Sequence, residues 1–230
     1  MTECLLNNEH CFLEQEAWQK VFVSAIKETP TMTDRSEIVI TLLMLKCFIP
    51  GYFADVTNII FNTQDGQALD PRNIASQLRQ LRADLLKWHG RYEGILRRTP
   101  KIPPGSAEYD SHCKVFATYL SCLIISSRLL GALSGIERLE LEDTAQSLAE
   151  QMFDLAIEVK DTSVATSLFM AQTLGVAQAT KATTEVWKGK DKAENEDQQS
   201  SNGIIARWRL ERWCKLCGRK LPSNVYAMCN

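Results

Sequence analysis

Apolar residues recur along most of the chain at the three- and four-residue spacing of an amphipathic α-helix. The clearest stripe lies in 72–97, where leucines, Trp88 and Tyr92 are separated by arginines and other polar residues. Asp70 and Pro71 precede this stripe as an N-cap and a first-turn proline. Stripes of this kind predict helices over 10–27, 34–48, 54–61, 72–97, 107–133, 141–160, 164–188 and 204–216.

The pattern shows neither strand-like alternation nor a repeat of fixed period. The sequence therefore predicts an all-α fold, a single domain over 1–230 of about six to eight packed helices. The segment 107–133 is nearly apolar in its second half and is expected to be the central helix, its end loosened by Gly131. The charged segment 188–202 is predicted to be a mobile surface loop, because it cannot bury enough apolar surface to offset chain entropy.

Composition narrows the class of protein. The chain has 230 residues, 45% of them hydrophobic, and a formal charge of −2, so it is no polycation built to coat nucleic acid. The apolar runs 38–50 and 119–133 are shorter than the roughly 20 residues of a membrane span, which predicts buried helices and no membrane. With no secretion signal, the eight cysteines are expected to be reduced thiols of an intracellular protein.

Cys214 and Cys217 form a CxxC pair in the stretch ERWCKLCGRK. Half of a zinc site, a redox dithiol and two packed thiols are the three interpretations. A structural zinc site needs four ligands; Cys229 can add a third thiolate, but all three histidines are remote in sequence. A redox dithiol is expected at a helix N-terminus, where the helix dipole lowers the thiol pKa. Gly218 instead marks this stretch as the C-terminal end of a helix. The pattern favours packed thiols and predicts no metal ligand.

The same stretch is basic. It can contact phosphates, but the favoured interpretation is a solvated face opposite an inward stripe that includes Trp208 and Trp213. The basic residues are Arg207, Arg209, Arg212, Lys215, Arg219 and Lys220.

Catalytic patterns are missing from the sequence: it has no P-loop, no GxGxxG and no GxSxG. His89 is interpreted as a helix-surface or boundary residue and not as a base, and no catalytic residue or cofactor is predicted. Arg128 interrupts the apolar run LIISSRLLGAL and, if buried, needs a partner. An ion pair with a carboxylate of a neighbouring helix is favoured. The alternative makes Arg128 the one candidate ligand-binding residue, an anchor for an acidic ligand in a helix-lined pocket.

Five stretches within 70–220 together resemble the C-terminal helical region of fungal binuclear zinc-cluster transcription factors. They are LRQLRADLLKWHGRYE, EYDSHCKVFATYLSCLIISSRLLGAL, LEDTAQSLAEQMFDL, LFMAQTLGVAQATKATTEVW and ARWRLERWCKLCGRK. The resemblance implies a non-catalytic regulatory domain that senses inducers or restrains an activation segment. In this family the DNA-binding module is a separate N-terminal cluster of six cysteines. Here the N-terminal cysteines are only Cys4 and Cys11, without a CxxC, so no sequence-specific DNA binding by this chain is expected.

Two functional hypotheses remain open. The first is a regulatory domain, in the nucleus or the cytoplasm, that contacts proteins of the transcription machinery or a DNA-binding subunit and takes a small-molecule effector. It is either the regulatory half of a longer factor or a free-standing co-regulator. The second hypothesis is a free-standing small-molecule-binding or catalytic helical protein of a fungal metabolic pathway. A large pocket with convergent polar groups favours the second, and a filled core with an exposed apolar groove favours the first.

Overall fold

The computed structural model describes residues 2–29, 31–61, 69–160, 164–189 and 201–221. Over these ranges the secondary structure is helical and contains no strand, which confirms the all-α prediction. The elements are α1 (Thr2–Asn7), η1 (Phe12–Glu14), α2 (Glu16–Ala25), α3 (Glu37–Lys46), α4 (Ile49–Phe61), α5 (Pro71–Leu96), η2 (Thr99–Lys101), α6 (Ala107–Leu133), α7 (Arg138–Val159), α8 (Val164–Ala182), α9 (Thr184–Lys188) and α10 (Ser201–Leu216), where η denotes a 3-10 helix.

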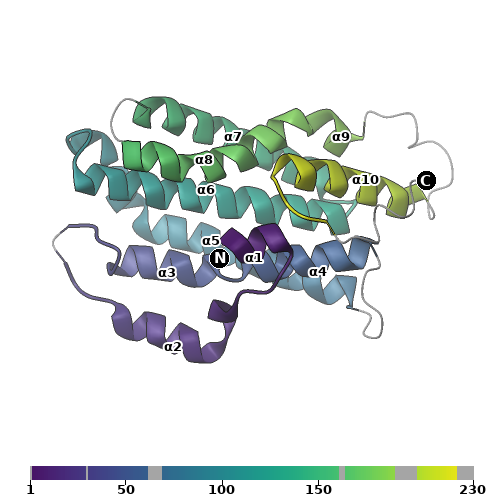
Figure 1. Cartoon of the computed structure of the whole chain (residues 1–230), viewed down its shortest axis with the longest axis horizontal. Coiled ribbons are helices and arrows are strands. Elements are labelled where there is room, and N and C mark those ends of the chain that lie inside the picture. Colours follow the sequence, from purple (N-terminus) through teal and green to yellow (C-terminus); the bar gives the residue numbers. More distant parts are fainter. Residues whose placement is uncertain (1, 30, 62–68, 161–163, 190–200, 222–230) are drawn as a thin grey trace.

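The long helices lie side by side along the longest axis of the molecule (Figure 1). Helix α6 occupies the middle and packs against α5, α7, α8 and α4. Helix α2 stands at the periphery, where it contacts η1 and α3. The central position expected for 107–133 is thus confirmed.

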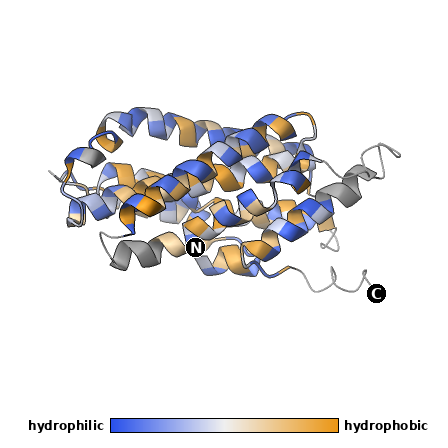
Figure 2. Ribbon diagram, turned by 90° about the horizontal axis from the view of Figure 1, so that it is seen from above, coloured by the Kyte–Doolittle hydropathy of each residue, from blue (hydrophilic) through white to orange (hydrophobic). Residues whose placement is uncertain are grey.

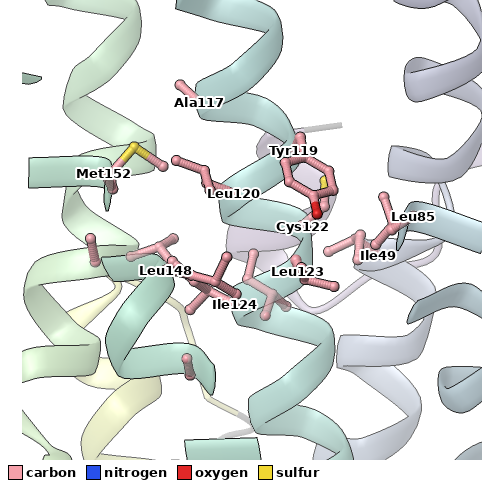
Figure 3. Close-up of a cluster of buried hydrophobic side chains, with 14 of the residues drawn as sticks. Ile49, Leu85, Ala117, Tyr119, Leu120, Cys122, Leu123, Ile124, Leu148 and Met152 are labelled. Atoms are coloured by element: carbon pink, nitrogen blue, oxygen red, sulfur yellow. The ribbon is translucent and has the colours of Figure 1, made fainter. Parts of the chain in front are cut away.

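Both flanks of α6 are buried against apolar side chains. On one side Leu120 and Ile124 meet Leu148 and Met152 of α7; on the other, Cys122 faces α4 and α5 (Figure 3). The surrounding helices carry hydrophobic and hydrophilic residues in turn along their length (Figure 2), as amphipathic helices around a central one must. Gly131 does not loosen the helix: α6 continues to Leu133, and a Cβ at Gly131 would lie 3.3 Å from Trp187 Nε1.

Two segments are long and apolar enough to cross a membrane, contrary to the expectation that the apolar runs are too short. These are Glu37–Phe61, which comprises α3 and α4, and Ala107–Leu133, which is α6. Other helices bury 83% of the apolar window in α6, as the prediction of a buried helix requires. The core helix of a soluble protein passes the same test of length and composition, so this observation is weak evidence for a span.

The predicted helix over 10–27 is wrong. The chain forms α1 before it and then η1 and α2, separated by extended backbone at Gln15 (φ −65°, ψ 141°). Phe12 and Trp18, which lie at roughly helical spacing within that range, are exposed and pack edge-to-face on each other, with ring centroids 5.4 Å apart. Their spacing therefore did not mark a core face.

The predicted interruption at Pro50 is also wrong, by a few residues. Helix α3 ends at Lys46 and α4 begins at Ile49, so Pro50 lies in the first turn of α4. In the first turn the missing N–H of proline costs no intrahelical hydrogen bond. The predicted helix 141–160 begins earlier, at Arg138, and 204–216 begins at Ser201. Most of the predicted loop 188–202 lies outside the described residues, but Lys188 belongs to α9 and Ser201 to α10.

The two ends of the described chain are tied together. After α10 the chain turns at Gly218, which has φ +76°, and the N–H groups of Gly218 and Arg219 donate to the carbonyls of Lys215 (3.1 Å) and Cys214 (2.9 Å). This Schellman motif confirms Gly218 as the helix stop. The buried Arg219 then donates through Nε to the Leu5 carbonyl of α1 (2.6 Å) and lies over the Phe53 ring of α4.

A histidine clamp holds the segment after α1 against α4. His10 Nδ1 lies 2.7 Å from Glu14 Oε1, and His10 Nε2 lies 3.0 Å from Asp55 Oδ1. Desolvation lowers the pKa of His10, but the hydrogen bonds and charges of Glu14 and Asp55 together raise it above its ordinary value. Gly51 leaves the space for this clamp, because a Cβ there would lie 2.7 Å from both His10 Nδ1 and Glu14 Oε2.

The clamp predicts a pH-dependent contribution to stability. Because the folded-state pKa of His10 is raised, its contribution is fully present below the unfolded pKa of about 6.5 and is lost as the pH rises through the folded pKa. We expect His10→Gln to lower the free energy of unfolding more at about pH 5.5 than at about pH 8.5. Denaturant unfolding at the two pH values measures the difference. Lys20→Gln, which removes an exposed pair with Glu16, is the control and should show no such dependence; an equal effect of His10→Gln at both pH values would contradict the clamp.

Candidate functional site

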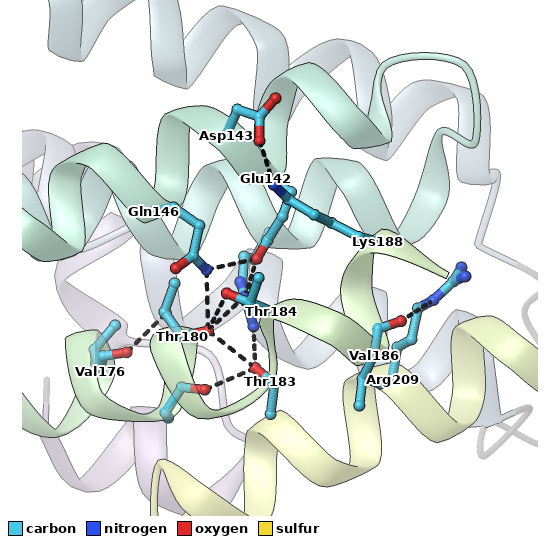
Figure 4. Close-up of polar contacts among 12 residues, drawn as sticks. Glu142, Asp143, Gln146, Val176, Thr180, Thr183, Thr184, Val186, Lys188 and Arg209 are labelled. Carbon is cyan, nitrogen blue, oxygen red and sulfur yellow. Dashed lines mark hydrogen bonds and ion pairs between the residues drawn. The ribbon is translucent and has the colours of Figure 1, made fainter. Parts of the chain in front are cut away.

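The candidate ligand residue Arg128 lies in a closed polar cluster between α6, α7 and α8. Its Nη2 donates to Glu142 Oε1 of α7 (2.5 Å) and to the Thr180 carbonyl of α8 (2.8 Å), and its Nη1 donates to Thr183 Oγ1. Both charged side chains are 0% exposed. Figure 4 shows Glu142 and Gln146 facing Thr180 and Thr183. The predicted ion pair with a neighbouring helix is confirmed.

This cluster explains why the predicted helix 164–188 is wrong. The helix breaks at Thr183, which leaves α8 ending at Ala182 and α9 as a separate short helix. Near the break, the Thr180 carbonyl accepts hydrogen bonds from Arg128 and from Gln146 Nε2 (3.1 Å). The same carbonyl also accepts from the Thr183 N–H at 3.3 Å, so side chains of α6 and α7 share it with a tightened backbone hydrogen bond at the break.

The guanidinium of Arg128 is also covered by tryptophan rings. Its Cζ lies 4.4 Å from the Trp187 ring centroid and 5.5 Å from that of Trp213. Desolvation lowers the pKa of Arg128 and raises that of Glu142, while each charge acts on the other in the opposite sense. Arg128 lines neither of the two cavities described below. The group is therefore built as an internal support and does not present its charge to a ligand.

The CxxC thiols pack as the favoured interpretation predicts. Cys214 is buried on the last turn of α10, and the half-buried Cys217 directly follows that helix. Burial raises the pKa of Cys214 to about 12 and raises that of Cys217, opposite to the lowering that a reactive dithiol needs. Among the residues that the structure describes, no group of three or more His, Cys, Asp or Glu side chains is arranged for a metal ion. Cys229 lies outside those residues.

The basic stretch forms the predicted solvated face only in part, because Arg212, Lys215 and Lys220 are exposed while the other cations are partly or fully buried. Arg209 is buried and donates through Nε to the Val186 carbonyl (2.8 Å), and Arg219 is buried against α1 and α4. Trp213 is buried as expected. Trp208 is 41% exposed and therefore does not belong to the stripe that faces the core. The cations of this stretch serve in part as internal hydrogen-bond donors.

The larger of two cavities lies elsewhere, where the C-terminal ends of α5 and α7 meet η2 and the start of α6. Its volume is about 520 Å³, within the range of sites for small organic molecules. Apolar and polar groups share the lining, which includes His89, Leu96, His112, Phe116, Asp154 and Glu158. Two of the three histidines of the chain therefore line one cavity.

The proton on His112 can be assigned from its neighbours. Residue 100 is proline and has no N–H for the carbonyl of Leu96, and the Thr99 hydroxyl donates to that carbonyl instead (2.7 Å). Thr99 Oγ1 also lies 3.0 Å from His112 Nδ1, and its single proton is already used, so Nδ1 carries the hydrogen and donates. Nε2 is then an acceptor. Desolvation lowers the pKa of the buried His112, which keeps the ring neutral at physiological pH.

An aromatic wall forms one side of the cavity. The half-buried His89 ring stacks on Tyr119 with centroids 4.8 Å apart, and Phe116 lies 6.1 Å from the same ring. These rings continue into the core through Trp88, whose centroid is 5.6 Å from that of Tyr119. The interpretation of His89 as a boundary residue is confirmed, since one face packs while the residue lines the cavity.

Carboxylate side chains line the other side of the cavity. Glu158 Oε1 accepts a hydrogen bond from Tyr109 (2.8 Å), which leaves its second oxygen available. Glu93 is paired with Arg97 at 2.5 Å. Asp154 makes no hydrogen bond or ion pair with any residue that the structure describes. The cavity therefore carries more negative than positive charge.

The cavity could not be predicted from the spacing of the histidines, because His89 and His112 are far apart in sequence. A usable signal was present: 72–97 and 107–133 are predicted helices joined by a short proline-rich connection, so they are expected to be antiparallel neighbours. Residues at similar distances from that connection, such as His89 and His112, then come close together. The charges contributed by α7 could not be placed in this way.

A second cavity of about 30 Å³ lies between α1, α4, α6 and α8. It has room for about one water molecule, with Thr118 and Ser121 among its polar lining groups. Its size excludes an organic ligand.

Comparison with family models, with curated proteins and with solved structures found no match to this chain.

Proposed function

We propose that this chain is a non-catalytic helical regulatory domain whose activity is set by a small organic molecule bound in the 520 Å³ cavity. The cavity is the observation that carries the ligand-binding part, because apolar and polar groups converge in a volume suited to such a molecule. The resemblance to the helical region of fungal zinc-cluster regulators supports the regulatory part. Proteins of the transcription machinery or a DNA-binding subunit are the proposed partners, in the nucleus.

A route from the cavity to the rest of the fold supports a regulatory role. The cavity is lined by four separate elements, the ends of α5 and α7, the 3-10 helix η2 and the start of α6. Helix α7 continues from Asp154 and Glu158 back to Glu142, which pairs with Arg128 beneath the α8–α9 break. A ligand that moves the end of α7 therefore acts on a helix that also holds the C-terminal half together. Helices packed in this way transmit displacements because a close-packed core deforms little.

A reporter experiment tests the proposal. The full chain is fused to a heterologous DNA-binding domain in a fungal strain, and reporter output is recorded across a panel of small metabolites. We expect output to change with one or more of them, and Gln151→Trp, which places a large side chain at the cavity lining, to abolish the change. Gln77→Trp on the exposed face of α5 is the control and should preserve it. Output that never depends on a metabolite, or that responds equally in the Gln151→Trp variant, would overturn the proposal.

The second candidate function is a free-standing metabolic protein, which is the hypothesis that a large pocket with convergent polar groups favours, and His112 lines that pocket. A neutral imidazole with an accepting Nε2 beside a cavity can serve as a general base. The two functions differ in one measurable respect: a regulatory domain leaves its bound molecule chemically unchanged. Recovery of the bound metabolite intact after prolonged incubation supports regulation, and its steady conversion supports catalysis.

A further inference from the structure

The hydrogen-bonding character of the cavity restricts the ligand that it takes; this step rests on the proposed function. His112 is buried, its Nδ1 is committed to Thr99, and its Nε2 has no partner among the described residues. Nε2 can only accept a hydrogen bond in this tautomer. A ligand that reaches His112 and excludes water from Nε2 must therefore bring a donor, or else leave this acceptor unsatisfied at a cost of about 1–3 kcal/mol.

The charge of the cavity lining also favours a ligand that donates hydrogen bonds. Among the described residues of the lining, Arg97 is the only one with a guanidinium or ammonium group, and it is already paired with Glu93. Asp154 and one oxygen of Glu158, both on exposed residues, have no cationic partner in the part of the chain that the structure describes. The C-terminal ends of α5 and α7 also border the cavity, and their terminal carbonyls carry partial negative charge. A single helix start, that of α6, opposes them, with Glu108 in its first turn.

We propose that the ligand of this cavity is an organic ammonium ion with an apolar, aromatic-sized body. The positive charge is balanced by Asp154 and Glu158, and the N–H groups donate to the acceptors that include His112 Nε2. The body lies against Leu96, Leu155 and the Phe116 ring. A carboxylate or phosphate ligand would face uncompensated like charge. A metal ion is not the occupant that the geometry supports, since the described residues provide no group of three ligands.

Three indoles that share one body and differ in charge test this inference. They are tryptamine, which is a cation at neutral pH, tryptophol, which is neutral, and indole-3-propionate, which is an anion. Isothermal titration calorimetry on the full chain gives their affinities. We expect tryptamine to bind at least about tenfold more tightly than tryptophol, and indole-3-propionate to bind most weakly of the three. Asp154→Asn should weaken the binding of tryptamine about three- to tenfold and leave the affinity for tryptophol unchanged.

A matched variant separates local from overall charge. Glu150→Gln makes the same change in net charge on the exposed side of α7, outside the cavity, and should leave tryptamine binding unchanged. If tryptophol or indole-3-propionate binds as tightly as tryptamine and Gln151→Trp blocks it, the cavity is a site and the inference of a cation is wrong. If none of the three binds, the inference is overturned, and the reporter experiment then decides independently whether the proposed function survives.

Discussion

Glu142→Ala lowers the free energy of unfolding by about 3–5 kcal/mol, the largest expected effect of a polar substitution in this molecule. The substitution leaves Arg128, which remains protonated at all accessible pH values, without a carboxylate in a fully buried position. The desolvation of that charge is then no longer offset. Denaturant unfolding of the wild type and the variant measures the difference.

Helix α7 supplies a control on the same element. Glu150 pairs with Lys181 at 2.8 Å, but both side chains are exposed, so Glu150→Ala should cost at most about 1 kcal/mol. The double variant Arg128→Met with Glu142→Leu should recover much of the loss, because apolar side chains of similar volume carry no desolvation cost. Similar losses for Glu142→Ala and Glu150→Ala would contradict the buried pair as a main support of the α6–α7–α8 contact.

Trp213→Ala lowers the free energy of unfolding by about 3–5 kcal/mol, because it opens a large void in the core. Trp213 is 0% exposed, and its ring stacks on Phe53 of α4 with centroids 5.3 Å apart and meets Trp187 of α9 edge-on at 5.7 Å. Its Nε1 has no hydrogen-bond partner, so the contribution comes from packing and from the contact with Arg128. Thermal or denaturant unfolding gives the magnitude.

Trp208 provides the matched comparison, since it lies on the same helix and is exposed. Trp208→Ala is expected to change the free energy of unfolding by no more than about 0.5–1 kcal/mol. A large loss for Trp208→Ala with a small one for Trp213→Ala would mean that α10 presents the opposite face to the core. The pair thus tests the orientation of the helix that carries the CxxC thiols.

The sequence predicts this fold well where local signals and burial agree. Asp70 and Pro71 fixed the start of α5, and the structure shows the Asp70 carboxylate accepting from the Arg72 N–H at 2.9 Å. The unbroken apolar run correctly predicted the central helix. Signals of this kind act within one or two turns, so they can be read from neighbouring residues.

The errors arise where distant residues decide the local structure. Helix α1 has no stripe and is held by the tail after α10, through the Lys220 N–H and the Leu6 carbonyl (2.9 Å). The break at Thr183 depends on Arg128, 55 positions away in sequence. The cavity needs several elements at once, and the tautomer of His112 depends on a proline, a threonine and a carbonyl that only the folded chain brings together.

The most direct test of the account is a titration of histidine-labelled protein with tryptamine, followed by the ring resonances in an NMR spectrum. The chain has only three histidines: His89 and His112 line the cavity, and His10 lies in the clamp on α4 and serves as an internal control. The account predicts saturable shifts of the His89 and His112 resonances and none of His10. If the resonances of His89 and His112 do not shift at saturating tryptamine, or if all three histidines shift equally, the result would contradict a ligand site between α5, α6 and α7.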